Sequence, residues 1–392
     1  MNSHISEPQV AVSSKHHLPW VDAARFTAIF LVVCCHCCDP FNLSPNAATD
    51  PDFGFFGAFY GSMVRPCVPL FAMMTGLLLL PVRNITMEGF YKKRLLRVLV
   101  PFLIWSLLYN LFPWVVGLFG GDSSFVTVFF PYAGAYGLEP SLSFASALKN
   151  IVLIPFNFSV YAVHMWYIYM LIGLYLFMPV ISSWLEKCSK RSLEVYLMLW
   201  GVTLFFPYVY QFLSTYFWGT CSWNSFGMLY YFAGFNGYLL LGYYLKKYNR
   251  MSLGKTLLAA IPLFLIGYVA TFTGFRHMMG NPAATEPMIE LFWTYCSPNV
   301  VLMTIAFFIL LQKVRIPSDR FSRWLNKVSI YGLGIYMCHY FFVGIGYVAA
   351  QKLGVPVALQ IPVAAILVMT LSWILTASAF RAFPKVAKWV LG

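Results

Sequence analysis

Charge is the scarcest property of this chain. Only 10% of the 392 residues are charged and 13 are acidic, whereas 60% are hydrophobic. Soluble globular domains carry about 25% charged residues, so this composition excludes an ordinary soluble protein. It also leaves no room for a separate soluble domain beside a membrane-embedded one.

Paired cysteines are also missing. The nine cysteines lie mostly in apolar segments, with no spacing typical of a disulfide framework or a zinc ribbon. Four of them flank a histidine in Cys34-Cys35-His36-Cys37-Cys38. Successive helical residues point in different directions and a closed zinc site needs four convergent ligands, so we expect no metal here. Small residues packed between helices explain the run, and a catalytic thiol is the alternative.

No internal repeat is found either. Many transporters are built from paired repeats with matching Gly/Pro-broken spans. The absence of such a pair in this sequence disfavours a transporter.

Long apolar stretches, by contrast, are abundant. A membrane-spanning helix needs about 20 apolar residues, and ten stretches reach that length. They are residues 19–38, 55–80, 95–119, 163–184, 194–213, 227–246, 256–273, 290–312, 329–350 and 357–380. We therefore predict an all-α, polytopic membrane helix bundle of about ten transmembrane helices over residues 18–384, with short tails at 1–17 and 385–392. The first stretch lacks a small-residue cleavage site, which favours a retained helix over a signal peptide.

The basic residues alternate between the two sides of this bundle. The segments that connect successive predicted spans are here called joints. Every second joint is poor in basic residues, and these joints hold only Lys149, Arg276 and Lys352. The other joints and both termini carry nearly all the rest, so the positive-inside rule places both termini in the cytoplasm. The net charge of +13 is thus a topology signal, and we expect no nucleic-acid partner.

Ionisable residues inside membrane spans usually mark a pathway or a reaction site. Arg25 and His36 lie eleven residues apart in the first span. At helical geometry they share one face, about 20° and roughly 16 Å apart. A neutral imidazole can accept a proton near physiological pH, and Asp39 is near enough to orient the ring. The alternative is a packed histidine with a snorkelling arginine.

Three further arginines lie at or within spans. Arg94 and Arg97 are three residues apart and share a helix face, which suits a pair of guanidinium groups that bind phosphate. Simple positive-inside anchoring is the alternative. Arg65 stands beside Pro66 and Pro69, which break helical hydrogen bonding. It is expected to line a cavity or to bind internal carbonyl groups.

Aromatic and histidine side chains recur in two later spans. His164 and Trp166 open the fourth span on the predicted outer side. An aromatic belt is one interpretation, and a stacking surface for a sugar ring is the other. Tyr336 and His339 lie three residues apart in the ninth span and add a second intramembrane imidazole.

Taken together, these motifs resemble the membrane-bound acyltransferase 3 family, which acylates sugars of bacterial surface glycans. Arg25 and His36 resemble its Arg-x10-His element, and Arg94-x-x-Arg97 resembles its cytoplasmic Arg-x-x-Arg. The other similar segments are Arg65-x-x-Val68-Pro69-Leu70-Phe71, His164-Met165-Trp166-Tyr167 and Tyr336-x-x-His339. The chain departs from the pattern at Thr75-Gly76, where the family usually has Ser-Gly.

The resemblance implies an O-acyltransferase of the bacterial inner membrane. It would move an acyl group, usually acetyl, from acetyl-CoA to a hydroxyl of an extracytoplasmic or lipid-linked glycan. His36 would be the general base with Asp39 beside it. The remaining site residues divide into acyl-CoA ligands (Arg25, Arg65, Arg94 and Arg97) and acceptor ligands (His164, Trp166, Tyr336 and His339).

Two other classes stay open at this point. A multi-span transporter of a glycan or a small acylated metabolite would use His36 as a proton relay. A sensor domain would neither transport nor transfer. Direct transfer and an acyl-enzyme are both compatible with the sequence.

Overall fold

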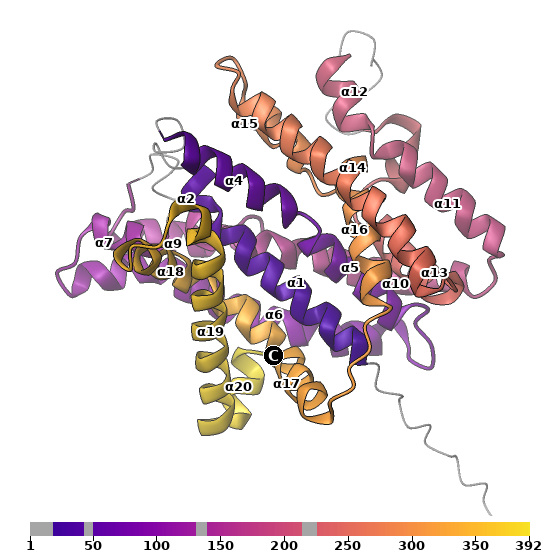
Figure 1. Cartoon of the computed structure of the whole chain (residues 1–392). Helices are drawn as coiled ribbons and strands as arrows, with labels where there is room; N and C mark the ends of the chain where they lie inside the picture. Colours follow the sequence, from indigo (N-terminus) through magenta and orange to yellow (C-terminus); the bar gives the residue numbers. More distant parts are fainter. Residues whose placement is uncertain (1–18, 43–49, 131–138, 214–225) are drawn as a thin grey trace, which may run out of the picture.

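The computed structural model describes residues 19–42, 50–130, 139–213 and 226–392. Within these ranges the chain is helical and has no strand, which confirms the all-α prediction (Figure 1). The elements are α1 (Pro19–Cys37), α2 (Asp39–Asn42), α4 (Pro51–Met63), α5 (Cys67–Leu79), α6 (Met87–Leu118), α7 (Ser123–Phe129), α9 (Phe144–Leu153), η1 (Val160–Met165), α10 (Trp166–Leu185), α11 (Lys190–Thr203), α12 (Phe206–Phe212), η2 (Gly227–Phe232), α13 (Asn236–Tyr248), α14 (Leu253–Met279), α15 (Glu286–Ile289), η3 (Glu290–Trp293), α16 (Pro298–Leu311), α17 (Asp319–Cys338), α18 (Tyr340–Lys352), α19 (Val357–Ala382) and α20 (Pro384–Val390).

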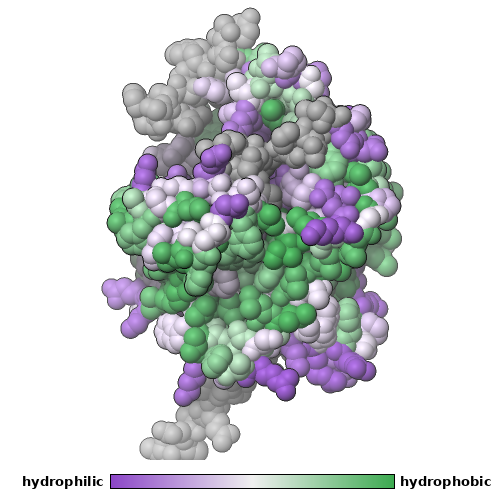
Figure 2. All heavy atoms as spheres, turned by 90° about the vertical axis from the view of Figure 1, so that its left-hand side faces the viewer, coloured by the Kyte–Doolittle hydropathy of each residue, from purple (hydrophilic) through white to green (hydrophobic). Residues whose placement is uncertain are grey.

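Eight helical stretches of the described chain are long and apolar enough to cross a membrane. A ninth is formed by α17 and α18 if this pair, bent by 83°, is one span. Figure 2 shows the result on one face, where a broad apolar band lies between hydrophilic residues at either end of the molecule. The chain is therefore a polytopic membrane helix bundle, as predicted.

The number of spans differs from the predicted ten at the sixth. Residues 227–246 form two pieces, the 3₁₀ helix η2 and the 13-residue helix α13. Gly234 separates them with a φ of +90°, a conformation that favours glycine and ends a helical run. Hydropathy alone does not register such a break, because the flanking residues stay apolar.

Helix α13 is held instead by close packing against α5. A Cβ atom on Gly76 would lie 2.0 Å from the carbonyl oxygen of Leu239, and one on Gly242 would lie 2.0 Å from that of Met73. Glycines that let two backbones approach this closely are a common device of helix packing in membranes.

Helix α1 lies at the centre of the bundle, where it packs against α5, α16, α17, α18 and α19 (Figure 1). More than half of its residues are buried, among them Ala24, Ala28 and Val33. The second stretch, α4 with α5, is broken at Val64–Pro66. At the C-terminal end, α20 packs against α6, and the Trp105 indole donates a hydrogen bond to the carbonyl of Val390 at 2.9 Å.

Candidate active site

His36 and Asp39 form a hydrogen-bonded pair where α1 gives way to α2. The His36 Nδ1 atom donates to Asp39 Oδ2 at 3.1 Å, and the two side chains are only 13% and 19% exposed. The predicted contact between the carboxylate and the ring is therefore present. It fixes the tautomer and leaves Nε2 able to accept a proton.

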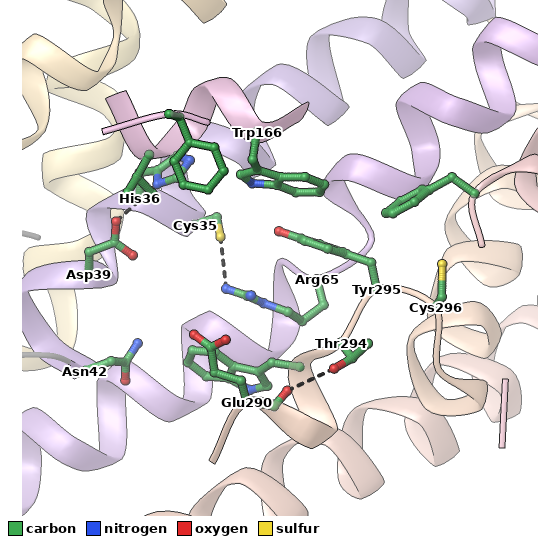
Figure 3. Close-up of a pocket in the computed structure, with 14 residues that line it drawn as sticks. Cys35, His36, Asp39, Asn42, Arg65, Trp166, Glu290, Thr294, Tyr295 and Cys296 are labelled. Carbon is green, nitrogen blue, oxygen red and sulfur yellow. Dashed lines mark hydrogen bonds and ion pairs between the residues drawn. The ribbon is translucent and has the colours of Figure 1, made fainter. Parts of the chain in front are cut away.

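This pair faces a cavity of about 420 Å³, which we call the His36 cavity (Figure 3). Its walls come from α1, α2, the α4–α5 break, η1, α10 and η3. The lining residues are Cys35, His36, Asp39, Asn42, Arg65, Phe158, Val163, Trp166, Phe235, Glu290, Trp293, Thr294, Tyr295 and Cys296.

Arg65 enters the His36 cavity from the break between α4 and α5. The break leaves the Gly61 carbonyl free, and Arg65 Nε donates to it at 2.9 Å. The Nη2 atom donates to Cys35 Sγ, also at 2.9 Å. The guanidinium lies 4.3 Å from the centre of the Trp293 ring and only 8% of the residue is exposed. Arg65 is thus a fixed, buried cation.

Aromatic rings line the same cavity, and one of them, Tyr295, has its ring centre 5.7 Å from the Arg65 guanidinium. Trp166 and Tyr295 are stacked, with ring centres 5.4 Å apart and planes 23° apart. Figure 3 shows the Glu290 carboxylate next to Arg65 and the Asn42 amide on the far side of the cavity from these rings. Flat rings that share a cavity with carboxylate and amide groups can hold a polyhydroxylated ring through stacking and hydrogen bonds.

A second cavity, of about 330 Å³, lies further toward the N-terminal end of α1. We call it the Arg25 cavity, because Arg25, Arg94 and Arg97 all line it. The spacing of Arg94 and Arg97 predicted a shared face, and both do reach one cavity from α6. Arg25 Nη1 donates to Ser329 Oγ at 2.9 Å and lies 3.6 Å from Asp22 Oδ1. Thr75 lines this cavity too.

A layer of three rings, Phe71, Tyr167 and Tyr336, forms part of the wall of the Arg25 cavity. Tyr167 lines the Arg25 cavity, whereas its neighbour Trp166 lines the His36 cavity. Tyr167 lies 5.8 Å from Phe71 and 5.4 Å from Tyr336, measured between ring centres.

Three arginines thus line a cavity toward one end of the central helix α1, and the His36–Asp39 pair lines a cavity at its other end. A family model described as an acyltransferase domain, that of the acyltransferase 3 family, matches residues 18–377. This match covers nearly the whole chain.

The chain belongs to the acyltransferase 3 family.

It is therefore a membrane acyltransferase, as the sequence motifs indicated. No curated protein and no solved structure gives a significant match to the chain.

The acyltransferase departs from the predicted grouping at Arg65. The family resemblance groups this residue with Arg25, Arg94 and Arg97 as an acyl-CoA ligand, but Arg65 lines the other cavity. The reason is the helix break, which turns the side chain toward Cys35 rather than along the span.

The other predicted acceptor residues are divided. Trp166 lines the His36 cavity and Tyr336 lines the Arg25 cavity. His164 and His339 line neither; they are 1% and 0% exposed and lie behind His36, with ring centres 6.2 and 5.4 Å from its ring. The Tyr336 hydroxyl donates to the His164 carbonyl, which ties α17 to η1.

Asn42, Glu290 and Tyr295 are cavity residues that the sequence reasoning missed. Glu290 carried a signal, since it is a carboxylate at the start of an apolar stretch. Tyr295 carried none beyond the general frequency of tyrosine near membrane interfaces. In the described part of the chain, no group of three or more His, Cys, Asp or Glu side chains is arranged to hold a metal ion.

Proposed function

We propose that this acyltransferase moves an acetyl group from cytoplasmic acetyl-CoA to a hydroxyl of a cell-surface or lipid-linked glycan, in the bacterial inner membrane. The observation that supports this most is the pair of cavities at the two ends of α1. One presents three guanidinium groups, and the other presents a base, aromatic rings and a buried cation.

The Arg25 cavity fits the donor. Arg94 and Arg97 come from the basic start of α6, on the side that the positive-inside rule makes cytoplasmic. Planar guanidinium groups bind phosphate oxygens in pairs. Arg25 stands deeper along α1 and is held by Ser329 and Asp22. The three cations would hold the CoA phosphates while the thioester end passes toward the layer of Phe71, Tyr167 and Tyr336.

The His36 cavity fits the acceptor. A sugar ring stacked on Trp166 and Tyr295 would have its hydroxyls among polar groups, of which Glu290 is one. His36 Nε2 would remove the proton from the reacting hydroxyl, and Asp39 would stabilise the imidazolium that results. The hydroxyl oxygen then attacks the acyl carbon. Arg65 is positioned to stabilise negative charge that develops on the acyl oxygen.

The first test concerns the donor. We expect detergent-purified protein to bind acetyl-CoA saturably, and Arg94→Ala/Arg97→Ala to lose most of that binding. Each charged hydrogen bond to phosphate contributes about 1.5–3 kcal/mol, so the double variant should weaken binding by at least 100-fold. Isothermal titration calorimetry would measure it.

Lys92→Ala/Lys93→Ala is the matched control. It removes the same charge from the same helix, but neither lysine lines the cavity. Equal losses in both double variants would mean general electrostatic attraction rather than a donor site. If folded wild-type protein binds no acetyl-CoA up to about 1 mM, the donor assignment fails and transport becomes the leading class.

A further inference from the structure

Cys35 stands apart from the other cysteines of the first span. It lines the His36 cavity one residue before His36 itself, whereas Cys34, Cys37 and Cys38 do not line it. Its sulfur accepts the hydrogen bond from Arg65 Nη2 at 2.9 Å, a contact that Figure 3 shows across the cavity. A thiol, a base and a fixed cation therefore share one pocket.

Arg65 forms no salt bridge with any described residue, although the Glu290 carboxylate lines the same cavity. Among the described residues, no Asp or Glu oxygen lies within ion-pair distance of its guanidinium. A buried cation is costly without a partner, and the hydrogen-bond acceptors it does have are the Gly61 carbonyl and the Cys35 sulfur. An adjacent guanidinium stabilises negative charge on sulfur, and the thiolate is the nucleophilic form of cysteine.

The geometry also sets a distance that the acyl group must cross. Ile29 lines the Arg25 cavity and Cys35 the His36 cavity, and six residues of α helix span about 9 Å. A nucleophile at the near end of the His36 cavity would divide the transfer into two steps. Each step would then need only one substrate in place.

We propose that Cys35 carries the acyl group as a thioester between donor and acceptor. This inference rests on the proposed function. In the first step the Cys35 thiolate attacks the acyl carbon of acetyl-CoA, a new C–S bond forms, the C–S bond to CoA breaks, and CoA leaves as a thiolate that takes up a proton. In the second step the acceptor oxygen attacks, its proton passes to His36, and the Cys35 thiolate is released beside Arg65.

This two-step route makes His36 and Cys35 separable by experiment. His36 is needed to activate the acceptor, so His36→Ala should form the acyl-enzyme and fail to discharge it. Cys35→Ala should form none. Cys35→Ser, which keeps a similar shape, should form either no adduct or an oxygen ester that discharges slowly.

The test uses full-length protein in detergent, acetyl-CoA labelled in the acetyl group and no acceptor. After acid quenching, tandem mass spectrometry locates the label and neutral hydroxylamine distinguishes thioesters from oxygen esters. We expect close to one hydroxylamine-sensitive acetyl group on Cys35 in His36→Ala, with one CoA released. Cys188→Ser, which alters a cysteine outside both cavities, should label like the wild type.

Three results would overturn the proposal. One is transfer by Cys35→Ala at the wild-type rate, and another is CoA release by His36→Ala with no label on Cys35. In either case the acyltransferase function stands and transfer is direct. If the wild type neither binds acetyl-CoA nor releases CoA in the presence of membrane glycan, the proposed function itself fails and this inference falls with it.

Discussion

Asp39 acts on His36 through a single hydrogen bond at Nδ1. The bond holds the ring in one orientation, and in the proposed mechanism Asp39 would also supply a negative charge to the imidazolium. Because the pair straddles the end of α1, a change at either residue should alter the chemistry with little effect on the bundle.

We expect His36→Ala to lower kcat for acetyl transfer by about 10²–10⁴-fold, the usual contribution of a general base. Asp39→Asn should lower kcat less, because the amide oxygen still accepts from Nδ1 while the charge is lost. KM for acetyl-CoA should not rise in either variant. Steady-state assays of CoA release would measure this, with His277→Ala as control because His277 lines neither cavity. A raised KM with normal kcat would place His36 in binding instead.

The sequence predicts which side chains lie together where the partners are only three residues apart. This holds for His36 and Asp39, on either side of the junction between α1 and α2, and for Arg94 and Arg97 within α6. Glu290 and Tyr295 reach the same cavity from a segment more than 200 residues away. Their placement depends on how η3 packs across the bundle, which no local spacing encodes. Arg65 lines the same cavity because the chain breaks between α4 and α5, which local spacing does not encode either.

At the scale of elements, the hydrophobic stretches predict most spans but not their interruptions. Residues 329–350 read as one apolar run, yet α17 and α18 meet at 83° around His339. There the ring Nδ1 donates to the Tyr336 carbonyl at 2.7 Å. That carbonyl would otherwise accept from the backbone one turn later, so the side chain replaces a helical hydrogen bond. Composition does not reveal this exchange.

The close contact between α5 and α13 can be tested by mutation. Hydropathy describes α13 poorly, because it predicts one span over residues 227–246. We expect Gly76→Ala to destabilise the protein by about 1–3 kcal/mol, because the new methyl group would meet the Leu239 carbonyl and force the helices apart. Thermal unfolding in detergent should show a lower midpoint. Gly173→Ala is the control, since a Cβ atom there has no neighbour within 4 Å. Equal midpoints for the two variants would show that α5 and α13 are not in this close contact.

At the scale of the whole molecule, α1 connects two chemically different ends. The Arg25 cavity lies toward the N-terminal end of this helix and the His36 cavity at its C-terminal end, and the neighbouring residues Tyr167 and Trp166 line one cavity each. For the proposed function, this arrangement would let a charged donor stay on one side of the membrane while its acyl group is used near the other. The basic residues of the joints predict which end of α1 faces the cytoplasm. This orientation of the chain can be tested directly.

We expect Lys92→Cys and Lys352→Cys to react with a membrane-impermeant maleimide from opposite sides. Both positions are exposed, at the start of α6 and at the end of α18, and the positive-inside rule places them in the cytoplasm and outside. The background would be Cys188→Ser/Cys221→Ser, which removes two cysteines from predicted joints. In intact cells only Lys352→Cys should be labelled, and after permeabilisation both should be.

Acetyl-CoA should then support transfer only when supplied from the side that exposes Lys92→Cys, because the Arg25 cavity lies toward that side. Labelling of Lys92→Cys in intact cells would invert the topology, and the cationic cavity would then face away from the cytoplasmic acyl-CoA pool.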